Sequence, residues 1–376
     1  MLTATPASAG HFWSDWSAPA RDRTAQASTT PEAGSGRQRL ITFVEPEESF
    51  LSQSIRNFGL TLATLGFYSF WARAEARKQL HRSIHIGGQR LDFTGTGREA
   101  CISFLIGTLT TVIVVSTFLY FFRGNGGSSD QMRAALSDFR YRRLFISLPL
   151  IFLLGSAVYR RRKVLLRRTW WRGQHFDLDG QPYAYALQHF WTAFLVPLTL
   201  GWAAPWRASR LAHRKIREMH LGDERFKTMG GVATLYRAFA TLWFGGGIIY
   251  VATMALLGLT VGPELIAAAS AGSLAPLRQP GVIETVVAVL AIGLTPVAMF
   301  LLYYRAAWIE HQISSIVFRD MRFHIKLPKV RFAALILWNG FVKLISFGAF
   351  APVADAALAR FVIDRIETER MPAQHH

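Results

Sequence analysis

The stretch TLGFYSFW at residues 64–71 decides the fold, and the similar stretch TLGWAAPW occupies residues 199–206. Gly66 and Gly201 weaken a helix that reaches them, and Pro205 removes a backbone donor, so a helix is expected to end at each motif. The tryptophan that closes each motif suits the boundary between lipid and water. Both motifs therefore predict short helices that enter a membrane part-way, with their freed backbone groups partnered by protein or water.

The composition also points to a membrane. Of 376 residues, 51% are hydrophobic and only 18% are charged, with 42 Lys and Arg against 24 Asp and Glu, a formal charge of +18. An apolar chain with a basic surplus is typical of membrane proteins that have Lys/Arg-rich cytoplasmic loops. The single cysteine, Cys101, excludes an internal disulfide framework and a cysteine-based metal cluster.

Long apolar runs predict four transmembrane helices, because about 20 apolar residues cross a bilayer. These are residues 100–122, 143–160, 233–259 and 282–304. Three shorter runs, interrupted by glycine or proline, are predicted to be re-entrant or interfacial: residues 51–70, 184–206 and 331–352. A full crossing at 184–206 would place one of two strongly basic segments, 160–183 or 207–227, outside the cell, against the positive-inside rule. Four spans leave both termini in the cytoplasm.

An internal repeat relates the two motifs. At an offset of 135 residues Trp71 aligns with Trp206 and His85 with His220. At an offset of 147 the Ala204-Pro205 pair aligns with Ala351-Pro352, which follows Gly348. We therefore expect two parallel membrane repeats and a third half-copy, as transporters often have. The predicted segments are a disordered cytosolic tail at 1–38, repeats at 39–172 and 173–322, a half-repeat at 323–370 and a tail at 371–376.

Short strands with turn dipeptides between them predict small cytoplasmic β-hairpins. The first has Ile84-His85-Ile86 before Gly87-Gly88, and others centre on Arg172-Gly173, Gly222-Asp223 and Arg319-Asp320. Isolated hairpins are marginal, so these strands are expected to pair with one another and with residues 40–43 in a small sheet. The predicted fold is an all-α polytopic membrane protein that carries these hairpins.

The segment from Asn57 to Arg73, together with residues 198–206 and 220–226, resembles the signature of the YjgN family. The likeness covers about residues 40–370. This is a family of bacterial inner-membrane proteins with no assigned molecular function, so the resemblance implies location in the inner membrane but no reaction and no cofactor. The third copy departs from the pattern, since Val353 stands where Trp71 and Trp206 stand.

Basic helices follow both tryptophans and predict contact with anionic lipid headgroups at the cytoplasmic leaflet. The candidate headgroup- or ligand-binding residues are Arg73, Arg77, His85, Arg207, Arg210, His220 and Arg225, with Arg73 the favoured one. The candidate structural residues of the motifs are Thr64, Gly66, Trp71, Gly201, Pro205, Trp206, Gly348 and Pro352. No recognised nucleic-acid module accompanies the charges, so nucleic acid is not an expected partner.

No metal or cofactor is expected. His81 and His85 have the i, i+4 spacing of a metal pair on a helix, but only His85 has a counterpart in the second copy, His220. The leading functional hypothesis is transport or handling of a lipid or other amphipathic molecule at the interface between repeats. One alternative is a membrane scaffold whose basic face binds anionic lipids or an acidic partner. The other is a lipid-modifying enzyme that uses His85 or His220, although a non-enzymatic role is favoured.

Overall fold

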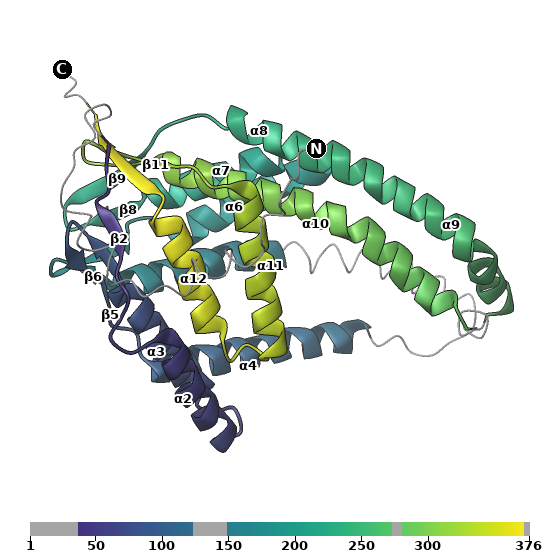
Figure 1. Cartoon of the computed structure of the whole chain (residues 1–376), viewed down its shortest axis with the longest axis horizontal. Helices are drawn as coiled ribbons and strands as arrows, with labels where there is room; N and C mark the ends of the chain where they lie inside the picture. Colours follow the sequence, from purple (N-terminus) through teal and green to yellow (C-terminus); the bar gives the residue numbers. More distant parts are fainter. Residues whose placement is uncertain (1–36, 123–148, 273–279, 372–376) are drawn as a thin grey trace, which may run out of the picture. The chain divides into compact units, whose positions relative to one another are not determined.

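Figure 1 shows a computed structural model of the chain, which describes residues 37–122, 149–272 and 280–371. The described residues from Gln38 onward belong to one unit. Several predicted segments lie wholly or partly outside the described residues. They are most of the N-terminal tail, the loop between the first two predicted spans, the first residues of the second span, and the C-terminal tail.

A nine-stranded sheet has the order β1-β12-β11-β10-β9-β8-β7-β6-β5, and a smaller sheet has the order β2-β3-β4. From β5 to β12, neighbouring strands run antiparallel. The strands are β1 (Arg37–Gln38), β2 (Ile41–Phe43), β3 (Ile84–Ile86), β4 (Gln89–Arg90), β5 (Asp92–Phe93), β6 (Thr169–Trp171), β7 (Gln174–Leu178), β8 (Met219–Leu221), β9 (Glu224–Thr228), β10 (Ile316–Phe318), β11 (Met321–Ile325) and β12 (Ile366–Arg370).

The three short apolar segments each form a pair of helices that leaves one strand and returns to its neighbour. The pairs are α2 (Phe50–Ala63) with α3 (Ser69–Arg82), α6 (Pro182–Leu198) with α7 (Ala204–Arg217), and α11 (Lys329–Ile345) with α12 (Ala351–Ile363). Before and after the three pairs, the strand partners are Phe43↔Ile84, Leu178↔Met219 and Ile325↔Ile366. Each of these segments therefore turns back toward the sheet, and its re-entrant or interfacial placement at a membrane stays a prediction.

The same backbone turn closes all three helix pairs. A large apolar residue and the glycine after it both have positive φ: 49° and 91° at Leu65-Gly66, 49° and 93° at Leu200-Gly201, and 48° and 84° at Phe347-Gly348. The hydroxyl before each turn accepts a backbone N–H four residues ahead: Thr64 from Tyr68, Thr199 from Ala203 and Ser346 from Phe350. The turns recur at the predicted offsets of 135 and 147 residues.

Longer helices also leave and return to neighbouring strands. Helix α4 (Gly97–Phe122) and a helix over 149–167 lie between β5 and β6, where Phe93 pairs with Thr169. Helices α8 (Ala233–Ala240), η2 (Thr241–Gly245), α9 (Gly246–Ala271) and α10 (Val282–Ser314) lie between β9 and β10. Within the described residues, Ala233–Glu264 and Val282–Ser314 are long and apolar enough to cross a membrane. They coincide with the third and fourth predicted spans, while the first two spans stay predictions.

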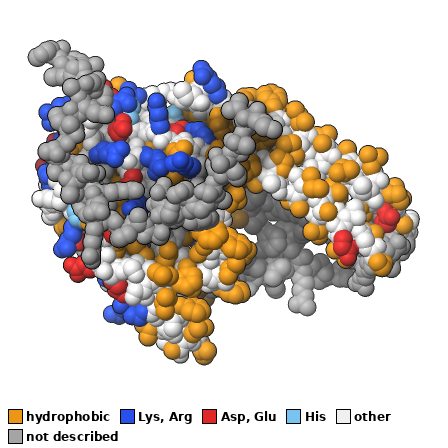
Figure 2. All heavy atoms as spheres, in the orientation of Figure 1, with side chains coloured by type: hydrophobic (Ala, Val, Ile, Leu, Met, Phe, Trp, Pro, Cys, Tyr) orange, Lys and Arg blue, Asp and Glu red, His pale blue; other side chains and the backbone are white. Residues whose placement is uncertain are grey.

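The antiparallel order places every helical excursion at one end of the strands and every tight turn at the other. Tight turns join β3 to β4, β6 to β7, β8 to β9 and β10 to β11. Helices lie between β2 and β3, β5 and β6, β7 and β8, β9 and β10, and β11 and β12. Figure 2 shows the chemical result: hydrophobic side chains cover α9 and α10, and Lys, Arg, Asp and Glu gather near the strands. Charged and apolar surface is thus divided between the sheet and the helices that leave it.

One part of the fold prediction needs correction. The described residues are mostly helical, as predicted, but the sheet is larger than the small one that was expected. The hairpins at Arg172-Gly173, Gly222-Asp223 and Arg319-Asp320 join a nine-stranded sheet, whereas residues 41–43 pair with the first hairpin in a separate three-stranded sheet. Strands of two to five residues cannot stand alone, so the hairpins pair with neighbouring strands. Beneath the sheet, Ile325 and Ile366 pack with Ala306, Phe332 and Phe361 from α10, α11 and α12.

Gly293 tests the packing of the two candidate spans. A Cβ atom at this position of α10 would overlap the side chain of Thr253 on α9. We expect Gly293→Leu to lower the unfolding free energy by about 1–3 kcal/mol, the usual result of overpacking. The control is Gly258→Leu on α9, where a Cβ meets nothing within 4 Å. Thermal unfolding in nanodiscs compares them, and equal midpoints for both variants and the wild type would contradict the packing described here.

Candidate functional site

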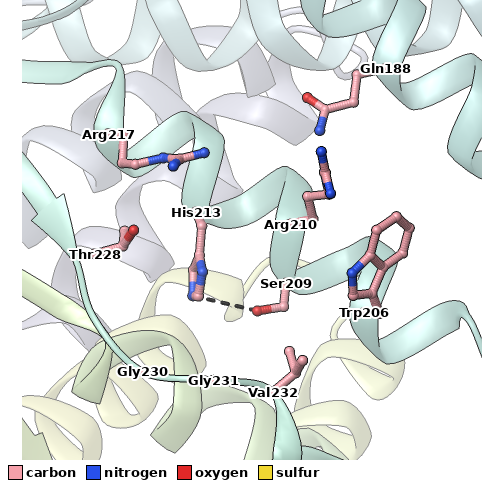
Figure 3. A pocket seen from close by; sticks show the side chains of 10 residues that line it. All are labelled: Gln188, Trp206, Ser209, Arg210, His213, Arg217, Thr228, Gly230, Gly231 and Val232. Carbon is pink, nitrogen blue, oxygen red and sulfur yellow. Dashed lines mark hydrogen bonds between the residues drawn. The ribbon is translucent and has the colours of Figure 1, made fainter.

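A pocket of about 390 Å³ lies beside the second helical hairpin, and one face of α7 forms its main wall. Trp206, Ser209, Arg210, His213 and Arg217 face it together because their spacing of three or four residues repeats the helical period. The remaining lining residues are Gln188 from α6, Thr228 at the end of β9, and Gly230, Gly231 and Val232 from the loop before α8. Figure 3 shows this arrangement, with Arg210 pointing toward Gln188.

The local sequence explains why α7 presents these side chains. Pro205 occupies the first turn of α7, where its missing N–H would have no helical partner. Arg214, on another face of α7, is held by Ala184 O at 3.0 Å, by Gln188 Oε1 at 2.8 Å and by Glu218 Oε1 at 2.8 Å. These bonds fix α7 to α6 and orient the Gln188 amide at the edge of the pocket.

The pocket lining is positively charged. Arg210 and Arg217 supply two fixed charges, and no carboxylate is among the lining residues. The Arg210 guanidinium carbon lies 5.1 Å from the centre of the Trp206 ring, a stacking that leaves its N–H groups free to donate at the edges. Two guanidinium groups, a threonine hydroxyl and a glycine loop favour an anion such as a phosphate or carboxylate.

Ser209 and His213 of the pocket lining lie close to a second histidine, His311, which does not line the pocket. Ser209 Oγ is 3.0 Å from Nε2 of His311 on α10 and 3.4 Å from Nε2 of His213. Burial lowers the pKa of His213, and the neighbouring His311 ring and Arg217 lower it further. Both rings are thus held close to one hydroxyl, and His213 favours its neutral form at neutral pH.

The sequence-predicted residues fall in several places. Arg210 and Trp206 line the pocket, whereas Arg207 donates to the carbonyl of His189 at 3.3 Å. His220 Nδ1 lies 3.2 Å and Arg225 Nη2 2.7 Å from the Asp179 carboxylate, on the sheet. In the first copy, the remaining candidates are spread over α3 and β3. Arg73 is exposed, the Arg77 guanidinium lies 5.6 Å from the Phe93 ring centre, and His85 pairs with Thr42.

The structural residues of the motifs have clear local roles. Gly66, Gly201 and Gly348 supply the positive φ of the hairpin turns, and Thr64 accepts the N–H of Tyr68. Pro352 begins α12 as Pro205 begins α7. Trp71 packs on Gly97 so closely that a Cβ there would lie 2.7 Å from its ring.

Sequence reasoning missed Gln188, Ser209, His213, Arg217 and the loop 228–232. Helical spacing from Trp206 would have found the α7 residues, because positions 206, 209, 210, 213 and 217 share one face. The loop and His311 had no such signal, since they are distant in the sequence. Among the residues that the structure describes, no group of three His, Cys, Asp or Glu side chains could hold a metal ion.

Comparison with known proteins gives one match. A family model described as "Bacterial protein of unknown function (DUF898)" matches residues 43–375. No curated protein and no solved structure matches the chain.

The environment of His213 can be tested by titration. Its folded-state pKa lies below the unfolded value of about 6.5, so the neutral ring stabilises the fold above that pH and stability falls as the pH drops below it. We expect Arg217→Gln to raise the His213 pKa toward 6.5, because it removes one positive neighbour. NMR titration of labelled histidines measures this, with Arg225→Gln on the sheet as control. A wild-type pKa above 6.5 would contradict the environment described here.

Proposed function

The chain belongs to the DUF898 (YjgN) family of bacterial proteins of unknown function, and we propose that it is a membrane protein that handles a lipid or other amphipathic anion. The observation that carries the proposal is the pocket of Trp206, where Arg210 and Arg217 face a glycine loop without a carboxylate. His85 and His220, one of which the enzyme alternative would use, lie on strands of different sheets, and neither lines this pocket.

The proposed location is the inner membrane, with the sheet and both ends of the described chain at the cytoplasmic face. All helical excursions leave the same end of the strands, which is what one bilayer on one side of the sheet requires. Gln38 of β1 lies beside β12, where its carbonyl accepts the Thr368 hydroxyl, so both ends of the described chain are at the sheet. In this arrangement the long helices cross the bilayer and the short hairpins enter it.

The second hairpin gives the pocket an amphipathic setting. Trp206 lies just beyond the turn that carries Leu198 and Leu200, which are exposed and apolar, and Arg217 ends α7 next to the sheet. A headgroup held by Arg210 and Arg217 can therefore leave its acyl chains along the apolar end of the same hairpin. Burial of those chains adds about 0.8 kcal/mol per CH₂ group, and the arginines select the anionic headgroup.

Arg217→Lys tests for a pocket that grips a headgroup. A planar guanidinium binds a phosphate through two parallel N–H bonds, whereas an ammonium acts as a point charge. We expect Arg210→Lys or Arg217→Lys to reduce co-purified anionic lipid by about tenfold, a loss of about 1.4 kcal/mol. The reduction should persist at 1 M salt, where the Debye length is about 3 Å. Quantitative lipid mass spectrometry on nanodisc-purified protein measures it.

The matched control is Arg225→Lys, because Arg225 pairs with Asp179 on the sheet and does not line the pocket. It should retain the wild-type amount of lipid. Equal, small losses in all three variants that vanish at high salt would reject the pocket and support a scaffold whose basic surface only attracts anionic lipids. Arg73→Lys belongs in the same series, since the sequence favoured that position.

The hairpin turns test the membrane placement. Leu65 and Phe347 at the turns are 98% and 99% exposed, and Leu200 is 76% exposed. In a Cys101→Ala background, single cysteines at these positions labelled with an environment-sensitive fluorophore should be quenched by brominated lipid tails. A label at Gly173, in a tight turn at the opposite end of the strands, should remain unquenched. Quenching at Gly173 alone would invert the proposed orientation, and none at the hairpins would exclude their insertion.

A further inference from the structure

The first helical hairpin contains a buried cluster of polar side chains. Gln53, Ser54 and Asn57 of α2 are only 1% to 5% exposed. Their spacing puts them on one face of the helix, and α2 packs against α3 and α12. Helix α3 adds Gln79, which is buried, and Glu75 one turn before it. We call these five residues the α2–α3 polar cluster.

Most polar atoms of this cluster have no hydrogen-bond partner in the described part of the chain. The unpaired atoms are Gln53 Oε1, Ser54 Oγ, Asn57 Oδ1, Asn57 Nδ2, Gln79 Oε1 and Glu75 Oε2. The Gln79 amide is oriented by Glu48, whose carbonyl accepts its Nε2–H. Each buried group without a partner costs about 1–3 kcal/mol. Several at one place therefore indicate that something else occupies their bonding positions.

The other two hairpins provide an internal comparison. At offsets of 135 and 147 residues, Asn57 corresponds to Thr192 and then to Asn339. Thr192 Oγ1 donates to Gln188 O at 2.7 Å, and Asn339 Nδ2 donates to Ala354 O at 2.8 Å. Gln79 corresponds to Arg214, which has the partners described above, and then to the apolar Phe361. At the positions of Asn57 and Gln79, the same scaffold therefore satisfies or removes the polar group in the other two copies, and it leaves both side chains with unpaired atoms in the first.

The chemistry of the open positions favours a cationic donor. Gln53, Asn57, Gln79 and Glu75 each offer an oxygen that only accepts, whereas Asn57 Nδ2 and the Ser54 hydroxyl are the donors among the unpaired atoms. Exchanging the two ends of the Asn57 amide leaves this balance unchanged. The Glu75 carboxylate adds negative charge, which Arg56 meets only at 3.8 Å while it pairs with Glu48 at 2.7 Å. An anion would find too few donors.

We propose that the α2–α3 polar cluster binds a primary ammonium group. A primary ammonium carries one positive charge and three N–H donors, which match the surplus of acceptors and the Glu75 carboxylate. Either an ethanolamine headgroup of a membrane lipid or a small free amine can supply it. The site lies on α2 and α3 and shares no residue with the pocket of Trp206, so it stands independently of the function proposed above.

The test compares the full-length protein in nanodiscs that contain phosphatidylglycerol with either phosphatidylethanolamine or phosphatidylcholine, whose quaternary nitrogen has no N–H. By native mass spectrometry, the wild type should retain phosphatidylethanolamine at least tenfold over phosphatidylcholine. Asn57→Leu and Gln53→Leu should lose this preference. Because they remove unpaired polar atoms, their unfolding midpoints in amine-free discs should equal or exceed that of the wild type.

The matched control is Asn339→Leu, the equivalent position in the third hairpin. It breaks the bond to Ala354 O, so it should lower the unfolding midpoint and still retain the lipid. If ethanolamine added to phosphatidylcholine discs raises the midpoint of the wild type and not of Asn57→Leu, the amine is a free solute and the ammonium assignment stands. The proposal is overturned if neither phosphatidylethanolamine nor ethanolamine distinguishes the wild type from Asn57→Leu, since water alone would then fill the bonding positions of the cluster. It is also overturned if Na⁺ without an amine raises the unfolding midpoint of the wild type and not that of Asn57→Leu.

Discussion

The rest of the structure depends on one constraint: the strand before each helical segment pairs with the strand that follows that segment. Phe43 pairs with Ile84, Phe93 with Thr169, Leu178 with Met219, Thr228 with Ile316 and Ile325 with Ile366. A helix that crossed a bilayer once could not meet this condition, because the chain must return to the same sheet. Helices therefore come in pairs or as turned-back hairpins, and an odd number of crossings between paired strands is excluded.

The repeated hairpin is a scaffold whose interior differs from copy to copy. The turn is nearly constant, with φ of 48° to 49° at Leu65, Leu200 and Phe347. The residues that face the inside of the hairpin differ between the copies. Of the three equivalent residues, Gln79 lies in an unpaired polar cluster, Arg214 in an ion-pair network and Phe361 in an apolar core. Since the backbone is held by the turn and the sheet, these interior positions can change without loss of the hairpin. Different chemistry in each copy is the consequence.

How much could be predicted from the sequence depends on how local each feature is. The turns at Gly66, Gly201 and Gly348 could be predicted because a glycine suits the positive φ that such a turn requires, and this signal lies within a few residues of sequence. The nine-stranded sheet could not, because strands of three residues carry almost no periodic pattern, and partners such as Asp177 and His220 are far apart in the chain. The same limit applies to the site: Trp206 and Arg210 belong to a recognisable motif, whereas His311 reaches Ser209 from a helix about a hundred positions later.

At the hairpin turns, the free-energy cost of backbone strain can be compared with the free energy of moving the side chain from water into lipid. A non-glycine residue in the left-handed region costs roughly 1–2 kcal/mol, and glycine at Leu65 or Phe347 would avoid that. In water these side chains add nothing in return, because they are almost fully exposed and pack against little. In a hydrocarbon layer, transfer of a Leu or Phe side chain out of water is favourable by about 1.5–3 kcal/mol, which offsets the strain. Insertion of the turns into lipid, as proposed above, would therefore compensate this strain. The hydroxyls of Thr64, Thr199 and Ser346 accept the backbone N–H groups of Tyr68, Ala203 and Phe350, as backbone away from water requires.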